Sequence, residues 1–375
     1  MIDRSSKRLR IVADDLTGAL DAAVGFVAGV GPVQVCRSAA AARDVDCAAI
    51  DIGTRDLPAC ALGPVLVATA GLFDDADLSF KKVDSLLRGH WAAELAFLWA
   101  RGRFDRCVVA PAFPQQGRIT AEGCLFVRDP VGAWAKAEGL SIVEALQRVG
   151  IACPERRTVS AAAAPFDGVA VFDVGSAQAL STLARAGLGW PGRTLWVGSA
   201  GLARALVGVP VPLQSMMVAP VLFVIGSAHP RTVAQVARLQ DVAGEHVVRH
   251  RPEDALASTA LGVRKRLHGP GRAAALCFDF PAGTSTASAE QMIAEVIAGL
   301  VREVERPATL VATGGQTLAK VCDAVGCSRL HVQAEWAPGI VFSRMDDGTW
   351  AGCQVLSKSG AFGGRELLAE FLQRL

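Results

Sequence analysis

Several motifs that would fix a function by themselves are missing from this sequence of 375 residues. It has no GxxxxGK[ST] loop, which excludes a P-loop NTPase. No GxGxxG motif follows its first strand-like run, so a dinucleotide-binding fold has no support. An HExxH zinc motif and a GxSxG nucleophile elbow are also missing. The function must therefore be argued from shorter motifs and from their order along the chain.

The cysteines form no CxxC pair, and most of them lie inside apolar runs such as RCVVAPAF. This pattern favours reduced, buried thiols in a cytoplasmic protein over a disulfide framework. The ten cysteines are Cys36, Cys47, Cys60, Cys107, Cys124, Cys153, Cys277, Cys322, Cys327 and Cys353.

An excess of one charge and a long apolar segment are missing as well. The 38 basic residues nearly balance the 36 acidic ones, and no basic stripe with interleaved aromatics occurs, so no nucleic-acid partner is expected. Residues 205–230 carry no Asp, Glu, Lys or Arg, but prolines and Gln214 interrupt them, so no membrane partner is expected. Only residues 11–13 form an apolar run before Asp14, which is too short for a signal-peptide core.

What the sequence does contain is a regular alternation of strand-like and helix-like runs. Hydrophobic residues make up 51% of the chain and charged residues 20%, a globular composition at a length that favours two domains. The alternation predicts an α/β fold in which each domain has a mainly parallel sheet flanked by helices, with the active site in the cleft between domains. An apolar, proline-containing linker near residues 208–217 places the domains at 1–212 and 213–375.

Polar clusters follow the strand-like runs repeatedly, where an open α/β sheet binds its ligands. One such cluster alone is usually a turn or a cap, but so many at equivalent positions favour binding sites. The clusters are ADDLTGA, DIGTR, KKVDSLLRG, PAFPQQGR, GSAGLA, GSAHPRT, TGGQT and KSGAFGG.

The clusters of the first half are ionic. Guanidinium and ammonium groups suit a carboxylate, and aspartates suit sugar hydroxyls or the proton of an attacking hydroxyl. We therefore expect a small, anionic, hydroxylated substrate here. The alternative for Asp84 and Ser85 is a helix N-cap, and for Arg88 a solvent-facing residue on the first turn of that helix. The candidate catalytic residues are Asp14, Asp15 and Asp84, and the candidate substrate-binding residues are Arg55, Lys82, Asp84, Ser85 and Arg88.

The clusters of the second half are rich in glycine and lead into helices. Backbone N–H groups at helix starts form an anion cradle, and glycines let phosphate oxygens approach closely. Lys358 adds a point charge. Three such turns in one domain suggest a nucleotide phosphate tail. An ionic half and a glycine-rich half together supply the parts of a two-domain kinase that uses ATP and Mg²⁺ and excludes water by closing.

The adjacent pair Asp14 and Asp15 has other possible roles. An aspartyl phosphatase would need the two aspartates separated by one residue, and a metal site lacks nearby histidines. His246 and His250 are four apart, but their segment is predicted to be a strand and gives a weak metal signal. A helix cap remains possible for one carboxylate. We predict that one aspartate faces substrate hydroxyls while the other fixes the turn.

In order along the chain, ADDLTGALDAA, KKVDSLLRGHWAAEL, PAFPQQGRIT, VGSAGLA, TGGQT and SKSGAFG resemble the four-carbon acid sugar kinases. The resemblance implies a sugar-acid domain followed by a nucleotide domain, and ATP-dependent phosphorylation of the terminal hydroxyl of threonate, erythronate or a 3-oxo-tetronate. Asp14, Asp15, Arg55 and residues 82–85 correspond to the substrate motifs. The ATP contacts that it implies are Ser227, Gly314, Gly315, Gln316, Thr317 and Gly360.

The sequence departs from the family pattern in a few places. Val83 stands where Thr is usual, His90 where Asn is usual, and His229 and Pro230 replace smaller polar residues. A non-catalytic sensor of sugar acid or nucleotide on the same scaffold is therefore the alternative function. A metal-dependent hydrolase or lyase has less support. The large apolar fraction also favours a homodimer.

Overall fold

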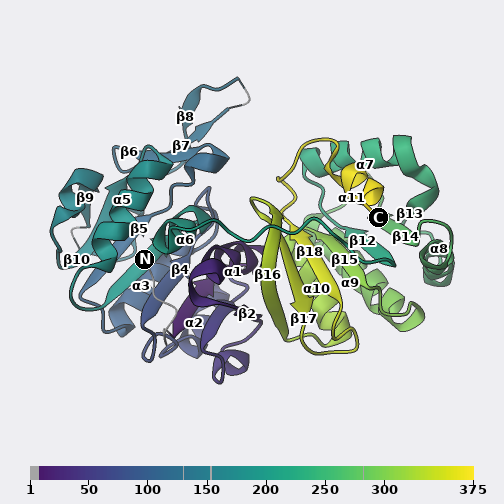
Figure 1. Ribbon diagram of the computed structural model, residues 1–375, viewed down its shortest axis with the longest axis horizontal. Helices are drawn as coiled ribbons and strands as arrows, with labels where there is room; N and C mark the ends of the chain where they lie inside the picture. Colours follow the sequence, from purple (N-terminus) through teal and green to yellow (C-terminus); the bar gives the residue numbers. More distant parts are fainter. Residues whose placement is uncertain (1–7, 130, 153, 282) are drawn as a thin grey trace. The chain divides into compact units, whose positions relative to one another are not determined.

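The computed structural model describes residues 8–129, 131–152, 154–281 and 283–375, so Cys153 lies outside the described residues. The chain divides into two compact units, Met1–Pro212 and Leu213–Leu375. Each unit is an α/β structure with a mainly parallel sheet and helices on it, which confirms the predicted fold class (Figure 1). The location of the active site between the units stays a prediction.

Unit 1 is built on eight parallel strands. Except for the edge strand β9, which is polar and mostly exposed, each strand is buried along most of its length, as expected for parallel strands covered on both faces. In spatial order the strands are β2 (Val33–Cys36), β3 (Cys47–Asp51), β1 (Leu9–Ala13), β4 (Leu78–Lys82), β11 (Thr194–Gly198), β5 (Arg106–Ala110), β10 (Gly168–Asp173) and β9 (Glu155–Thr158).

Two groups of helices cover the two faces of this sheet. Phe26 of α1 packs edge-on against Phe80 of β4, with ring centroids 5.6 Å apart. Val12 faces the opposite way and joins a core with Leu95 and Leu146. One group consists of α1 (Leu16–Val30), α5 (Ala177–Leu188) and α6 (Ala200–Val207). The other consists of α2 (Leu62–Ala68), α3 (Trp91–Arg101) and α4 (Ile142–Arg148).

A small antiparallel sheet in unit 1 was not predicted. Its strands are β6 (Arg118–Ala121), β7 (Cys124–Arg128) and β8 (Trp134–Lys136). A short 3-10 helix, η4 (Val159–Ala163), follows β9. The other 3-10 helices are η1 (Ala40–Ala42), η2 (Ala59–Ala61), η3 (Pro114–Gln116) and, in unit 2, η5 (Gly244–His246).

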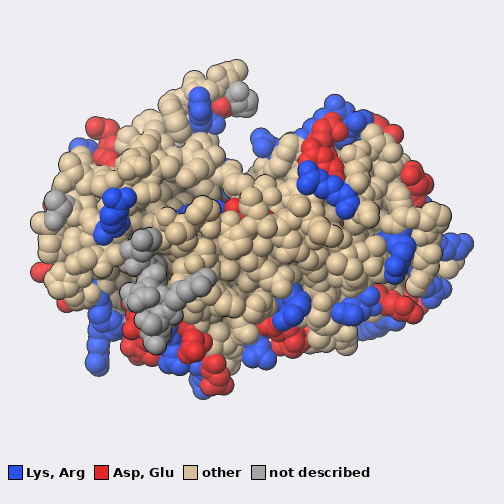
Figure 2. Space-filling view, in the orientation of Figure 1, with Lys and Arg blue, Asp and Glu red and all other residues tan. Residues whose placement is uncertain are grey.

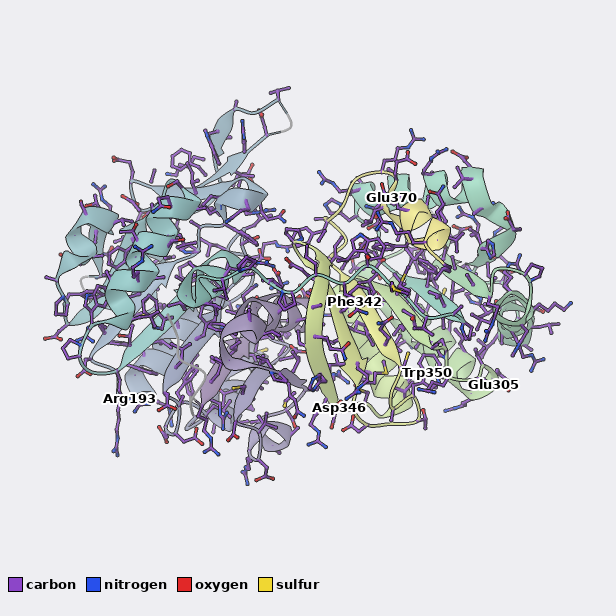
Figure 3. The ribbon with its side chains drawn as sticks, viewed as in Figure 1. Arg193, Glu305, Phe342, Asp346, Trp350 and Glu370 are labelled. Atoms are coloured by element: carbon purple, nitrogen blue, oxygen red, sulfur yellow. The ribbon has the colours of Figure 1, made fainter. Side chains whose placement is uncertain are left out.

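Unit 2 has five parallel strands followed by two antiparallel ones. In spatial order they are β13 (Val247–His250), β14 (Ala273–Phe278), β12 (Val221–Ile225), β15 (Thr309–Thr313), β18 (Gln354–Lys358), β17 (Ile340–Met345) and β16 (Arg329–Ala337). Helices α7 (Pro230–Ala243) and α11 (Leu367–Gln373) pack together, as do α8 (Leu256–His268), α9 (Thr286–Glu303) and α10 (Gly315–Val325). Phe371 of α11 and Phe342 of β17 belong to the same buried core; Phe342 is labelled in Figure 3.

In each unit, successive connections between strands run to opposite sides of one strand. This change of direction indicates where a ligand binds. In unit 1, β1 leads to β2 on one side, whereas β3 leads across to β4 on the other. In unit 2, β12 leads to β13, whereas β14 leads across to β15. Open α/β sheets bind ligands at the carboxyl ends of strands at such a switch point. The ligand sites are therefore expected at the carboxyl ends of β1 and β4, and at those of β12 and β15.

Surface charge and hydropathy agree with the composition. Basic and acidic side chains are mixed on the face of each unit that Figure 2 shows. Across the described ranges, none of the helices combines the length and the apolar character that a membrane crossing requires. The nine described cysteines have free thiols, and only Cys60 is exposed.

Candidate active site

The switch point of unit 1 is centred on an ion pair between Asp14 and Arg55. Asp14 directly follows β1, and its side chain is fully buried. Arg55 lies in the loop after β3 and binds both carboxylate oxygens of Asp14, with Nε–Oδ2 and Nη2–Oδ1 distances of 2.8 Å. The Arg55 backbone N–H also donates to the Asp14 carbonyl at 3.1 Å. The loop after β3 is thus fixed to the end of β1.

Asp15 is the N-cap of α1, which begins at Leu16. Its carboxylate accepts from the Gly18 N–H at 2.9 Å and from the Thr17 hydroxyl at 2.5 Å. The same carboxylate lies 2.6 Å from Arg55 Nη2. Asp15 therefore satisfies free N–H groups at the helix start and also joins the ionic cluster.

Asp84 closes a turn after β4 and does not cap a helix. Its carboxylate accepts from the Leu86 N–H at 3.0 Å and from Arg88 Nε and Nη2, each at 2.9 Å. The next helix, α3, begins only at Trp91, with His90 in the N-cap position. The structure therefore rules out the alternative of an N-cap at Asp84 and Ser85, and the prediction that Arg88 lies on the first helical turn was wrong. Arg88 precedes the helix, with its side chain 61% exposed.

Lys82 brings a second cation to this edge. It is the last residue of β4 and is almost fully buried. Its ammonium group donates to the Val83 carbonyl at 3.0 Å, and a methyl group placed on Gly18 would lie 3.1 Å from it. Lys82 therefore lies at the start of α1, close to Asp15. Ser85 is half-buried in the turn that Asp84 closes.

The charges of this cluster hold its carboxylates ionised. Burial alone would raise the pKa of Asp14, but the nearby charges of Arg55 and Lys81 overcome it and lower the pKa below its usual value. Burial also opposes the shift at Asp84, where the hydrogen bonds from Arg88 and the charge of Arg55 hold the pKa well below the usual range. Burial opposes ionisation of Arg55, yet Asp15 and Asp14 raise its pKa further above the ordinary value. Asp14 and Asp84 are therefore firm anchors and weak proton acceptors.

Asp51 is a carboxyl group of this edge that the sequence motifs did not single out. It ends β3 opposite Ala13 of β1 and accepts one hydrogen bond, from the Gly53 N–H at 2.9 Å. Burial and the neighbouring carboxylate of Asp15 raise its pKa from 3.8 to about 7. A single aspartate after a strand gives no pattern, and only the pairing of β3 with β1 shows its position.

A second missed feature is a buried ionic contact behind the site. Lys81 Nζ lies 2.6 Å from Glu94 Oε2, and both side chains are completely buried. The Thr54 hydroxyl donates to the other Glu94 oxygen at 2.5 Å. Glu94 of α3 thus joins β4 to the loop that carries Arg55.

The switch point of unit 2 brings three glycine-containing turns together. Gly314, between β15 and α10, has a φ of 102°, and its N–H donates to the Lys358 carbonyl at 2.8 Å. A methyl group on Gly314 would lie 3.6 Å from Ser227 Cβ, and one on Gly360 would run into the Ser227 hydroxyl. The turns after β12, β15 and β18 therefore meet at this edge, and a side chain at position 360 would collide with Ser227.

The start of α10 places backbone donors beside these turns. The helix begins at Gly315, so Gly315, Gln316 and Thr317 form its first turn, where N–H groups have no partner within the helix. Thr317 is buried, and its hydroxyl lies 3.3 Å from the position of a methyl group on Gly314. The first turn of α10 therefore lies beside the turn that carries Ser227.

His229 and Pro230, the departures from the family pattern, form the start of α7. His229 is the N-cap, and its Nδ1 accepts from the Arg231 N–H at 3.1 Å. Pro230 takes the first helical position, where a missing N–H is harmless. The Thr232 hydroxyl of the same helix donates to the Gly360 carbonyl at 2.8 Å. Their local role is therefore to begin a helix that holds the turn after β18.

Lys358 is the cation of this second site. It ends β18, it is buried, and its ammonium group lies 3.2 Å from the Ser359 carbonyl and 3.4 Å from the Phe362 carbonyl. Burial and the charge of Arg231 lower its pKa to about 8. An anion bound at the cradle would favour the charged form of this lysine.

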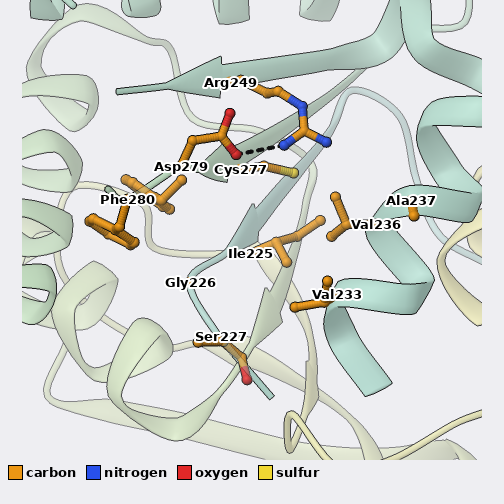
Figure 4. Close-up of a pocket in the computed structure, with 12 residues that line it drawn as sticks. Ile225, Gly226, Ser227, Val233, Val236, Ala237, Arg249, Cys277, Asp279 and Phe280 are labelled. Carbon is orange, nitrogen blue, oxygen red and sulfur yellow. Dashed lines mark hydrogen bonds and ion pairs between the residues drawn. The ribbon is translucent and has the colours of Figure 1, made fainter. Parts of the chain in front are cut away.

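A mainly apolar pocket of about 230 Å³ opens beside Ser227 (Figure 4). Ser227 lies at one end of it, and an ion pair between Arg249 and Asp279 spans the other end, with 2.6 Å between Nη1 and Oδ1. The pocket and the three turns occupy the same carboxyl edge of the sheet, because β14 pairs with β12. No sequence motif indicated this pocket.

The geometry does not support a metal site at His246 and His250. His246 is bonded to the Ala273 carbonyl at 2.9 Å and His250 to the Thr259 hydroxyl at 2.8 Å, so the two rings serve separate structural contacts. Within the described ranges, no three His, Cys, Asp or Glu side chains are grouped so that they could hold a metal ion.

Comparison with known proteins decides the family. A family model described as a sugar-binding N-terminal domain matches residues 9–142, and one described as a nucleotide-binding C-terminal domain matches residues 222–368. The chain is 31% identical over 416 residues to a D-threonate kinase from Cupriavidus necator, covering 96% of this chain and 95% of that protein. The chain belongs to the four-carbon acid sugar kinase family.

Other relatives extend the same comparison. The kinase is 26% identical over 426 residues to a 3-oxo-tetronate kinase from Pseudomonas savastanoi pv. phaseolicola, covering 98% of this chain and 97% of that protein. Its fold is also similar to a crystal structure of a Salmonella typhimurium protein, with a TM-score of 0.72, 18% identity and 98% of both chains covered. That likeness shows the fold alone.

Within each unit, the structure brings the kinase's predicted residues together. Asp14, Asp15, Arg55, Lys82 and Asp84 lie at one edge of the unit 1 sheet, where Arg55 pairs with Asp14 and Asp15 and lies 3.8 Å from the Asp84 carboxylate. Arg88 reaches this cluster through Asp84, and Ser85 follows Asp84 in the same turn. The predicted nucleotide residues meet at the corresponding edge of unit 2.

Proposed function

We propose that this kinase transfers the γ-phosphoryl group of ATP to the terminal hydroxyl of a four-carbon acid sugar, with D-threonate as the first substrate to test. The observation that carries the proposal is that each unit has a different site at its switch point: an ionic cluster in one and a backbone N–H cradle in the other. Unit 1, residues 1–212, is accordingly the sugar-acid domain, and unit 2, residues 213–375, the nucleotide domain. A homodimer and closure of the two domains remain expectations.

Arg55 is the group that best suits the carboxylate of the substrate. Its Nε and Nη2 are engaged by Asp14 and Asp15, whereas Nη1 has no partner among the described residues. Its guanidinium is held by a buried ion pair, so little entropy is lost when an anion binds. Lys82 adds positive charge beside α1. The hydroxyls of the sugar then meet Asp15 and Ser85 as hydrogen-bond acceptors.

The cradle of unit 2 suits the phosphates. Ser227, the first turn of α10 and Gly360 come together at one edge of the sheet with their N–H groups and hydroxyls, and Lys358 supplies a charge at the same edge. The apolar pocket beside Ser227 suits the nucleoside. The two features together favour a nucleotide over a lone phosphate ion.

In the reaction, the hydroxyl oxygen forms a bond to the γ-phosphorus while the bond from that phosphorus to the β–γ bridging oxygen breaks and ADP leaves. The hydroxyl proton passes to a carboxylate. Asp14 and Asp84 are poor acceptors because arginines hold both of them, so their role is to orient Arg55 and Arg88. Asp51 is the carboxyl group whose pKa lies near neutrality, which suits a proton acceptor.

The residues do not form a Mg²⁺ cage of their own, since no three suitable ligands are grouped in the described ranges. Mg²⁺ is usually held through phosphate oxygens, waters and one or two carboxylates, so we expect it to enter with the nucleotide. When bound, it would neutralise phosphate charge. The role of the chain itself is to bind and orient the two substrates.

A coupled assay of ADP release tests the proposal. D-threonate, L-threonate, D-erythronate and 3-oxo-tetronates are each supplied with ATP and Mg²⁺, and the products are checked for a phosphorylated terminal hydroxyl by mass spectrometry and NMR. Turnover on at least one tetronate supports the proposal. No turnover on any of them, together with no ATP binding by calorimetry, contradicts it. ATP binding without a phosphorylated product would instead favour the sensor.

A further inference from the structure

The pocket beside Ser227 has one apolar part and one charged end. Ile225, Val233, Val236 and Cys277 line the apolar part, and Val233 is 58% exposed although it is an aliphatic residue on a helix. Covering such an exposed apolar surface with a flat apolar group removes it from water, which is favourable. The cavity of about 230 Å³ is large enough for a nucleobase but leaves the polar part of a nucleoside at its ends.

Two aromatic rings flank the charged end. Phe278 and Phe280 both line the pocket, and their rings are stacked, with centroids 6.3 Å apart and planes 7° from parallel. Asp279 stands between them in sequence (Figure 4). Its backbone N–H donates to the His250 carbonyl at 2.9 Å, which fixes the position of this segment against the end of β13.

The position of Asp279 in the sheet relates it to the phosphate cradle. Asp279 follows β14, and β14 pairs with β12, whose own turn carries Ser227. Neighbouring strands lie about 4.8 Å apart, so one ribose can span the step from one strand end to the next. In dinucleotide-binding sheets, an acidic residue at the equivalent place accepts hydrogen bonds from ribose hydroxyls, while the adjacent strand end binds phosphate.

The Asp279 carboxylate is bound by Arg249 through one oxygen only, as far as the described residues show. Oδ1 lies 2.6 Å from Arg249 Nη1, whereas Oδ2 has no partner among the described residues. Arg249 lies on β13, and Figure 4 shows its guanidinium bonded to this carboxylate at the end of the pocket opposite Ser227. An ionised carboxylate with a free oxygen is a strong acceptor for hydroxyl groups and cannot donate a hydrogen bond.

We propose that Asp279, positioned by Arg249, accepts hydrogen bonds from the ribose hydroxyls of the bound nucleotide, while the base lies on the apolar part of the pocket. Ribonucleotides are thereby preferred over 2′-deoxyribonucleotides. This inference rests on the nucleotide-binding part of the proposed function, and it is independent of the identity of the sugar acid.

Isothermal titration calorimetry with ATP, 2′-deoxy-ATP and ITP tests the inference on the full chain. Hydrogen bonds to a charged group contribute about 1.5–3 kcal/mol, so the wild type should bind ATP about ten- to a hundredfold more tightly than 2′-deoxy-ATP. In Asp279→Asn this ratio should fall to about threefold or less, through weaker binding of ATP alone. The ratio of ATP to ITP, which differ at the base, should not change.

Glu366→Gln is the matched control, because Glu366 pairs with Arg238 at 2.7 Å in an exposed ion pair of the same unit outside the pocket. It should leave all ratios unchanged. Arg249→Gln should reduce the ATP to 2′-deoxy-ATP ratio without removing ATP binding, which a merely structural role would not do. Melting temperatures show that each variant is folded.

Three outcomes overturn the inference. An unchanged ratio of ATP to 2′-deoxy-ATP affinities in Asp279→Asn shows that the carboxylate does not bind the ribose hydroxyls. A changed ATP to ITP ratio shows that it reads the base. A wild type that binds no nucleotide removes both this inference and the proposed function. By contrast, the expected ratios without turnover on any tetronate would refute the proposed function and leave the ribose contact in place.

Discussion

Arg55 and Asp14 form a two-point ion pair at the centre of the unit 1 site, with Nε–Oδ2 and Nη2–Oδ1 distances of 2.8 Å. The Asp14 side chain is fully buried, whereas Arg55 retains 14% exposure. The ion pair therefore orients the Arg55 side chain and leaves one edge of its guanidinium for a ligand. The two adjacent aspartates therefore have different roles, because Asp14 holds the arginine while Asp15 caps α1.

Asp14→Asn and Asp15→Asn should differ for this reason. Asp14→Asn removes the buried counter-charge of Arg55 and should lower the free energy of unfolding by about 3 kcal/mol. Asp15→Asn keeps a good N-cap and should cost less than about 1 kcal/mol, while weakening turnover through its lost charge. Urea unfolding and steady-state kinetics of both variants measure the split. Equal, mild effects from both would show that the pair is only a solvated turn.

Asp51 gives the kinase a pH-dependent stability whose sign follows from its raised pKa. Because the folded pKa is about 7 against 3.8, the native state keeps this proton between about pH 4 and pH 7, and the stabilisation is lost as the pH rises through that window. Asp51→Asn removes the titration. Its free energy of unfolding relative to wild type should therefore rise by about 1–3 kcal/mol from pH 5 to pH 8, as measured by urea unfolding.

Asp44→Asn is the control for that experiment, because Asp44 is an exposed aspartate of the same unit. Its difference from wild type should stay constant over the same pH range. A constant difference for Asp51→Asn as well would show that Asp51 is ionised throughout and would remove it as a proton acceptor.

The parts of this fold that were predictable are those with local signals. The runs that became β1, β4, β12, β15 and β18 are short and apolar, and each ends at a polar cluster. Both sites were found because parallel strands bring their carboxyl ends to one edge, so that motifs far apart in sequence become neighbours. The antiparallel strands β6, β7 and β8 escaped prediction because they are short; β6 and β7 are only partly buried and β8 is exposed, so none has a clear apolar pattern.

The residues that were missed depend on pairing that no local pattern encodes. Glu94 lies on a helix whose neighbours are apolar, and its buried position makes sense only when Lys81 of another element is opposite. Arg88 was wrongly placed on a helix because Asp84 resembles an N-cap in sequence. In the structure its carboxylate takes the Leu86 N–H and the Arg88 guanidinium instead, and Gly89, at a φ of 77°, turns the chain before α3 begins.

The glycines of the cradle allow a matched pair of variants in one loop. A methyl group on Gly360 would run into the Ser227 hydroxyl and lie 3.2 Å from His229 Cβ, whereas one on Gly364 would meet nothing within 4 Å. Gly360→Ala should weaken ATP binding at least about tenfold, because the N–H groups of the cradle must move apart. Gly364→Ala should stay within about twofold, since no atoms are displaced. Calorimetric Kd values with melting temperatures make the comparison, and equal Kd values would place the phosphates elsewhere.

The buried contact between Lys81 and Glu94 should be the most sensitive point of unit 1 to a single charge removal. Glu94→Gln leaves the Lys81 ammonium group fully buried without its counter-charge, at a cost of about 3–5 kcal/mol in the free energy of unfolding. The double variant Lys81→Met with Glu94→Gln should recover part of that loss, because it removes the buried charge as well. Glu366→Gln breaks an exposed pair and should cost less than about 1 kcal/mol. If Glu94→Gln costs no more than Glu366→Gln under urea unfolding, the contact is not the buried support of the Arg55 loop that its geometry indicates.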